Sequence, residues 1–176
     1  PSASPSASPS ASPSASPSAS PTKCPYVRCD FNSVVPGMFL NKAAQANALM
    51  AECGLKVTAT NRDMVTPRDA NVFDSSNVNG TSPADVDLGS PNEDCPGGGP
   101  GVGIGGGPST NFSNCVPQGN LVIIQNPANV ESDPNDNVNG GCLFFEFARL
   151  VELVNMGALD FDEAGATITA LDAGNN

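Results

Sequence analysis

The stretch Leu55-Lys-Val-Thr-Ala-Thr60 decides the fold class of this chain. Apolar Leu55, Val57 and Ala59 alternate with polar residues, and a period of two is typical of a β-strand with one buried face. The sequence therefore predicts a half-buried strand at 55–60.

One helix is predicted directly before this strand. The run 41–53, Asn-Lys-Ala-Ala-Gln-Ala-Asn-Ala-Leu-Met-Ala-Glu-Cys, is rich in helix formers. Asn41 suits the N-cap, and Gly54 suits the left-handed position that follows a helix. Further upstream, the apolar residues of 31–40 surround Pro36-Gly37, which predicts a strand and a turn.

Further strands are predicted after residue 60. Short apolar or alternating runs occur at 70–74, 120–125, 142–147 and 158–163, and another strand begins at 167–169. Many short strands separated by Gly and Pro favour a mainly β fold. The fold that we expect is an antiparallel β-sandwich of the jelly-roll type with one short helix.

The last strands refine this expectation. In 142–147, Leu143, Phe145 and Phe147 fall on one face, whereas residues 148–156 suit a helix or a strand equally. The strand at 167–169 is cut short by the chain end. We therefore expect residues 23–176 to form one disulfide-containing β-sandwich domain that is truncated at its C-terminus.

Residues 1–22 are predicted to form a separate rod. Pro-Ser-Ala-Ser is repeated five times from Pro1 to Ser20. Proline restricts φ and donates no amide hydrogen, so the expected state is a polyproline II helix, which would reach roughly 60 Å if fully extended. Its serine and proline residues face all sides. Either a glycosylated rod or a plain flexible linker fits this composition.

The repeat resembles the hydroxyproline-rich glycoproteins of plant and algal walls and surface filaments. The resemblance covers residues 1–21 and implies proline hydroxylation and O-glycosylation. The positions to which it assigns O-linked sugar are Pro1, Ser2, Ser4, Pro5, Ser6, Ser8, Pro9, Ser10, Ser12, Pro13, Ser14, Ser16, Pro17, Ser18, Ser20 and Pro21.

The order of motifs in residues 31–170 is similar to that of a β-sandwich module of uncharacterised secreted and surface proteins in algae and bacteria. The resemblance implies a fold and a secreted location but no established activity. Cys95, Cys115 and Cys142 do not belong to the pattern of that module. The motifs are 72–74, 87–92, 98–107, 119–125, 133–137, 140–141 and 159–163.

Composition limits the partners of this protein. It has 7 Lys and Arg against 18 Asp and Glu, and its formal net charge is −11. Nucleic acid and anionic membranes are therefore unfavourable partners. No apolar run is long enough to span a membrane.

The cysteines and two sequons favour an extracellular location. Six cysteines without a CxxC pair, in a chain without histidine, indicate disulfides rather than zinc. Of the fifteen connectivities, we favour Cys95–Cys115 and Cys24–Cys29, which leave Cys53–Cys142. The sequons lie at Asn79 and Asn111. With no signal peptide and no initiator methionine, the chain is expected to be processed or a fragment.

Acidic residues in Asp/Asn/Gly-rich segments form a candidate Ca²⁺ site. Calcium binds six to eight oxygens, which such segments supply, and segments distant in sequence can meet at one end of a jelly roll. Solvated loop carboxylates explain the same pattern. The candidates are Asp74, Asp85, Asp87, Asp133, Asp136, Asp160 and Asp162.

Two functions remain open at this point. The first is a structural extracellular glycoprotein, a rod-plus-domain unit of a glycan-coated surface fibre or cell-wall matrix that associates with itself or with other wall or fibre glycoproteins. The second is a Ca²⁺-dependent carbohydrate-binding or adhesion module on a stalk. An enzyme is not expected: Asp160 and Asp162 would lie roughly 7 Å apart on a strand, a spacing within the range of inverting glycosidases, but the chain has no His or Trp.

Overall fold

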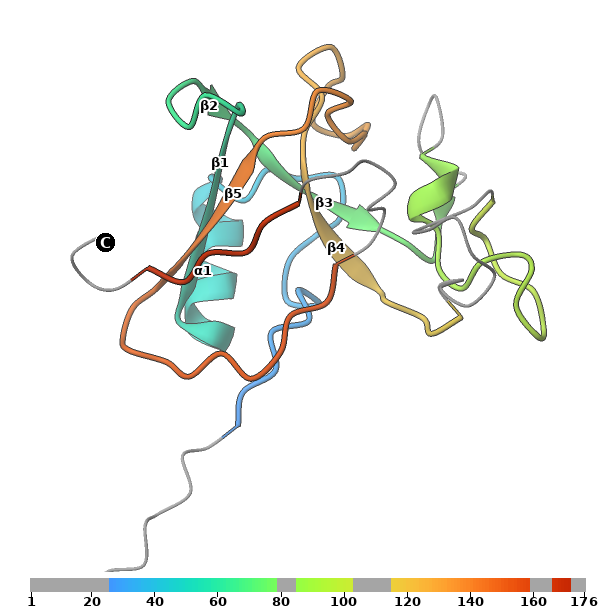
Figure 1. Cartoon of the computed structure of the whole chain (residues 1–176), viewed down its shortest axis with the longest axis horizontal. Coiled ribbons are helices and arrows are strands. Elements are labelled where there is room, and N and C mark those ends of the chain that lie inside the picture. The colour runs from blue at the N-terminus through green and yellow to red at the C-terminus, as the bar shows by residue number, and fades with distance from the viewer. Residues whose placement is uncertain (1–25, 79–84, 103–114, 159–165, 172–176) are drawn as a thin grey trace, which may run out of the picture.

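The structure is a computed structural model that describes residues 26–78, 85–102, 115–158 and 166–171 (Figure 1). The predicted rod, Cys24, both sequons, Asp160 and Asp162 lie outside these residues. The described elements are α1 (Ala43–Cys53), β1 (Leu55–Thr60), β2 (Pro67–Arg68), β3 (Ala70–Asp74), the short 3₁₀ helix η2 (Val86–Leu88), β4 (Asn120–Ile124) and β5 (Cys142–Phe147).

The strands form two antiparallel sheets. One has the order β2-β1-β5, and the other pairs β3 with β4. Helix α1 leads directly into β1 and packs beside it (Figure 1). The prediction of a mainly β fold with antiparallel sheets and one α-helix is therefore confirmed for the described part of the chain.

Helix α1 ends as its sequence predicts but begins differently. Gly54 has a left-handed conformation (φ 62°), and its N–H donates to Met50 O at 2.9 Å. The N-cap is Lys42 and not Asn41, and its side chain makes no capping hydrogen bond. Asn41 instead donates from Nδ2 to Asp69 Oδ1 at 2.9 Å, so a tertiary contact competes with the local cap.

The register of β1 and β5 explains why apolar residues alternate with other residues in both strands. Leu55 lies opposite Phe147, Val57 opposite Phe145 and Ala59 opposite Leu143. The three β1 side chains are buried, and Leu143 and Phe145 pack against the same core. The predicted apolar faces of both strands are thereby confirmed, with Phe147 at the exposed margin.

Strand β3 separates two apolar cores. Ala70 and Val72 belong to the larger core, which also contains Leu49 of α1. Phe73 points to the opposite side, into a smaller core with Leu88. Because both faces of β3 are covered, all but the last of its residues are buried.

Two strand predictions are wrong among the described residues. Residues 31–40 contain turns and a single bridge, Phe39 to Asn71. Residues 167–169 have no regular structure. A strand needs neighbouring backbone groups as well as suitable side chains, and these segments do not obtain a continuous ladder.

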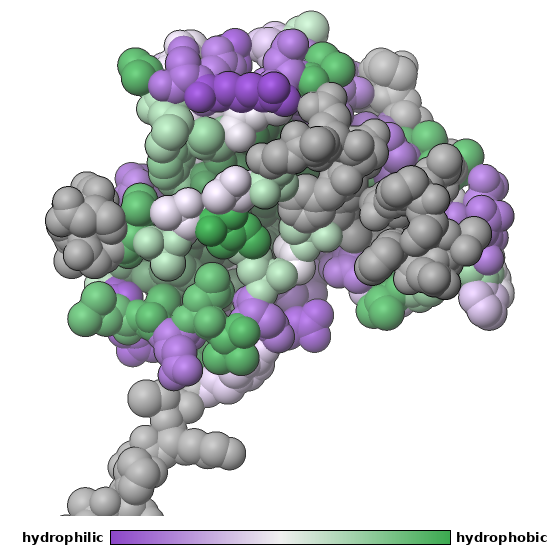
Figure 2. Space-filling view, in the orientation of Figure 1, coloured by the Kyte–Doolittle hydropathy of each residue, from purple (hydrophilic) through white to green (hydrophobic). Residues whose placement is uncertain are grey.

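The chain after β5 runs over the surface. Residues 148–158 are neither helix nor strand, which resolves the ambiguity of residues 148–156. Several of its large apolar side chains are exposed, and Figure 2 shows apolar residues gathered where this segment crosses the lower left of the molecule. These side chains are Leu150, Val151, Leu153, Val154 and Met156, which we name the apolar strip. Within the described ranges, no helix has the length and hydropathy of a membrane span.

Candidate functional site

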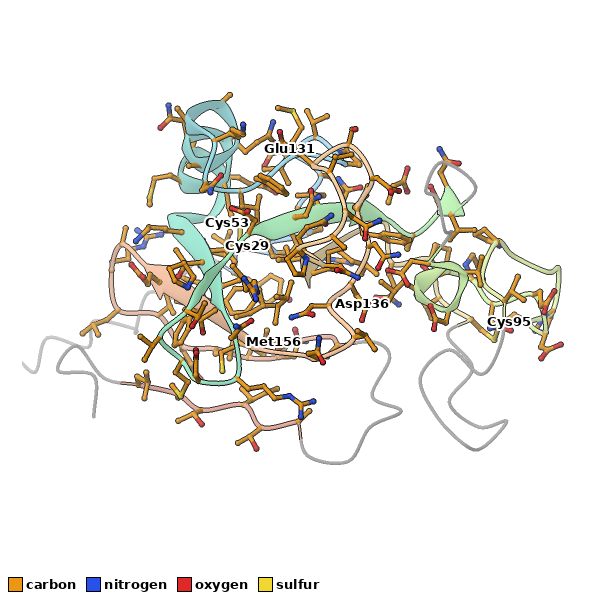
Figure 3. All side chains as sticks on the ribbon, turned by 90° about the horizontal axis from the view of Figure 1, so that it is seen from above. Cys29, Cys53, Cys95, Glu131, Asp136 and Met156 are labelled. Atoms are coloured by element: carbon orange, nitrogen blue, oxygen red, sulfur yellow. A yellow bond between two sulfur atoms is a disulfide. The ribbon has the colours of Figure 1, made fainter. Side chains whose placement is uncertain are left out.

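Two disulfides connect distant parts of the described chain. Cys95–Cys115 is confirmed, with Cα atoms 5.4 Å apart. Cys29 bonds to Cys53 at a Cα separation of 5.8 Å, so the predicted pairs Cys24–Cys29 and Cys53–Cys142 are wrong. Figure 3 shows Cys29 and Cys53 together beside α1 and Cys95 in a different part of the molecule.

The sheet register explains why Cys53 and Cys142 are not paired. Cys142 lies opposite Thr60, at the far end of β1 from α1. At about 3.3 Å per residue, the seven residues from Cys53 to Thr60 separate the two cysteines by roughly 20 Å. Cys142 is a free, half-buried thiol, and the prediction that all six cysteines are oxidised is wrong at this position.

The Cys29–Cys53 bond joins the start of the described chain to the body of the domain. Cys29 lies three residues after Tyr26, the first described residue, and Cys53 is the last residue of α1. A disulfide that closes a loop of 24 residues contributes about 3 kcal/mol by the chain-entropy model. It therefore fixes the start of the described chain to the end of α1.

A buried polar network anchors the loop that follows β4. Asn71 has no exposed surface, and its Nδ2 donates to Gln125 Oε1 and to Glu131 O, both at 2.9 Å. Gln125 Nε2 donates in turn to Asp133 O at 3.0 Å. Sequence reasoning missed these residues, because a polar residue inside a strand does not by itself indicate its partners.

Glu131 extends this network to the segment before α1. Its Oε1 accepts a hydrogen bond from Phe39 N at 2.7 Å, and its Oε2 lies 3.4 Å from Lys42 Nζ. Residues 39, 71 and 131 are thus held together although they are far apart in the sequence.

The structure brings two candidate calcium ligands together. The N–H of Asp136 donates to Asp85 Oδ2 at 2.8 Å, which links the loop before η2 to the loop before β5. Asp136 is half-buried. One carboxylate and one backbone group in contact do not make a complete calcium site.

The other described candidates make local contacts. Asp74 Oδ1 accepts from Ser76 N and Oγ, and Asp87 Oδ1 accepts from Leu88 N. Asp133 Oδ2 accepts from Asn129 Nδ2 at 2.8 Å. In the part of the chain that the structure describes, no three His, Cys, Asp or Glu residues are grouped so that they could hold a metal ion.

Asp63 shows how a single exposed carboxylate can order a turn. It accepts hydrogen bonds from the hydroxyl and N–H of Thr66 and from Val65 N, between β1 and β2. The Thr66 hydroxyl contributes most to holding the pKa of this carboxyl below its ordinary value. This role is structural, since the carboxylate is fully exposed and stabilises its own turn.

The described part of the chain therefore offers a disulfide that ties its first residues to α1, and one contact between two acidic residues, Asp85 and Asp136. Comparison with models of known families, with curated proteins and with solved structures found no match.

Proposed function

We propose that this protein is a structural extracellular glycoprotein, a rod-plus-domain unit of a glycan-coated surface fibre or cell-wall matrix. The observation that carries the proposal is the fivefold Pro-Ser-Ala-Ser repeat, joined to a domain whose first described residues are bonded to α1 through Cys29–Cys53. A force transmitted along a rod would reach the core through the Cys29–Cys53 disulfide. The residues between Cys29 and α1 would then not be pulled out of the fold.

Three further features support this proposal. Disulfides persist in oxidising compartments outside the cytosol, and two are formed among the described residues. Two sequons are present at Asn79 and Asn111. The two antiparallel sheets share an apolar core, which supports a jelly-roll-like β-sandwich as the body of the unit. We propose no enzymatic activity.

The experiment that tests this function is a peptide mass map of the chain from its native source. We expect residues 1–21 to carry hydroxylated proline and O-linked sugar on several positions, because serine and proline face every side of a polyproline II helix. Chemical deglycosylation should lower the mass of that peptide. The peptide 43–56 lacks serine, proline and a sequon and should keep its mass. Unmodified mass throughout 1–21 would leave a plain linker and contradict the proposal.

The second candidate function is a Ca²⁺-dependent carbohydrate-binding or adhesion module, which the contact between Asp136 and Asp85 favours. If these residues contribute to a cation site, excess Ca²⁺ should raise the Tm through linkage. The rise should disappear in Asp85→Asn/Asp136→Asn and persist in the charge-matched variant Glu93→Gln/Asp94→Asn. Equal calorimetric midpoints in Ca²⁺ and in chelator would eliminate this function.

A further inference from the structure

Strand β5 has a free edge. It pairs with β1 over six residues on one side. On its other side, the described residues provide neither a strand nor an isolated bridge. Alternate N–H and C=O groups of a strand point to each side, so this edge presents unpaired backbone groups to an additional strand.

The segment Ala166–Leu171 has the properties of such a strand. Its sequence, Ala-Thr-Ile-Thr-Ala-Leu, contains three consecutive β-branched residues and no charge. All six residues are exposed, including Ile168 at 66% and Leu171 at 53%. No hydrogen bond joins them to any other residue that the structure describes.

The segment is not part of either sheet among the residues that the structure describes. Figure 1 draws it in red as chain without an arrow. In Figure 3 it lies at the margin of the molecule, beyond the segment that carries the labelled Met156. A neutral β-branched segment whose peptide groups are not paired with the described residues gains hydrogen bonds and apolar contacts when it meets a strand edge.

The surface around β5 favours a strand over other kinds of contact. The exposed apolar strip begins three residues after β5 ends. The one charged residue of β5, Glu146, lies 3.0 Å from Lys56 Nζ on β1. Two copies each carry a net charge of −11 and repel one another, and a contact between a neutral segment and an edge whose one carboxylate is paired adds no close like-charge pair to that repulsion.

We propose that Ala166–Leu171 of one copy adds as an antiparallel strand to the free edge of β5 of a second copy. The antiparallel direction follows the pairing already present in this sheet. This inference deepens the self-association in the proposed function by assigning its contact surface. Repeated addition from copy to copy would join the domains in a row, each carrying its own repeat.

The free thiol of Cys142 allows a direct test on the full chain. Antiparallel addition places residue 171 beside the start of β5, where Cys142 lies, and residue 166 beside Phe147. Leu171→Cys should therefore give disulfide-linked dimers and longer oligomers on mild oxidation, seen by non-reducing electrophoresis. Ala166→Cys, about 16 Å further along the strand, should not. These linked species must disappear when Cys142→Ser is added to Leu171→Cys.

Proline substitution tests the same contact without a cross-link. Leu143 of β5 faces away from β1, because the hydrogen bond from Ala148 N to Gly54 O places the even-numbered residues of β5 toward β1. Ala170→Pro removes the backbone donor that would lie opposite Leu143 and should weaken dimerisation by about tenfold or more in sedimentation velocity, with an unchanged Tm. Gly157→Pro lies outside the segment, at a position where an added Cβ meets no described heavy atom within 4 Å, and this variant should dimerise as the original chain does.

Two results would overturn the proposal. If the chain dimerises but Ala170→Pro and Leu171→Cys behave like their controls, another surface mediates self-association and the proposed fibre role stands. If the chain remains monomeric at every concentration, the strand contact does not form. The peptide mass map of residues 1–21 then decides the proposed function independently.

Discussion

Asn71→Ala is expected to lower the free energy of unfolding by about 3 to 4 kcal/mol. The Asn71 amide donates two hydrogen bonds, to Gln125 Oε1 and to Glu131 O, in a fully buried position. Its removal leaves both acceptors buried without this donor, and each unsatisfied buried polar group costs about 1 to 3 kcal/mol. Urea unfolding followed by circular dichroism measures the loss.

Asn139→Ala is the matched control for this variant. Asn139 is exposed, and its backbone N–H, which the substitution keeps, makes its contact with Asn137. We expect its effect to stay within about 0.5 kcal/mol, as for most surface substitutions. Equal unfolding midpoints for Asn71→Ala and Asn139→Ala would show that the network does not stabilise the fold.

Removal of the Cys29–Cys53 disulfide is expected to cost about 3 kcal/mol, because the unfolded chain regains the freedom of a 24-residue loop. For a domain of this size that corresponds to a fall in Tm of roughly 6 to 12 °C. Calorimetry of Cys29→Ser/Cys53→Ser measures it. Limited proteolysis should also cleave near Tyr26 faster, because the bond no longer holds this end of the described chain against α1.

Cys142→Ser is the control for this variant, because it replaces a cysteine without removing a disulfide. Cys142 is a half-buried free thiol, so this variant should keep a midpoint close to that of the original chain. A non-reducing peptide map should recover Cys29 linked to Cys53. Recovery of Cys24 linked to Cys29, or an equal loss in Cys142→Ser, would contradict the assignment.

Local patterns in the sequence predicted most of the regular elements. The alternation at 55–60 and 142–147 indicated both the strands and their buried faces, and helix formers followed by Gly54 indicated the end of α1. These features depend on neighbours one to four residues away, which the sequence contains. The Cys95–Cys115 pair was also predicted, since the two cysteines bracket a glycine-rich loop.

Contacts between distant segments could not be predicted in this way. The spacing of the cysteines favoured Cys24–Cys29, but the packing of α1 brings Cys53 to Cys29. Similarly, the β-branched residues of 167–169 predicted a strand, yet no described backbone pairs with them. Side-chain type sets the preference for a strand, whereas a partner edge decides whether it forms.

The sequence by itself determined the repeat, the net charge, the helix and the strands with their apolar faces. Only the tertiary structure decided that Cys29 bonds to Cys53, that Asn71 holds the loop after β4, that Asp136 meets Asp85 and that β5 keeps a free edge. The physical reason is that periodicity is a property of consecutive residues. Disulfides, buried hydrogen bonds and strand edges depend instead on which distant residues the sheet register and the packing of α1 bring within a few ångströms.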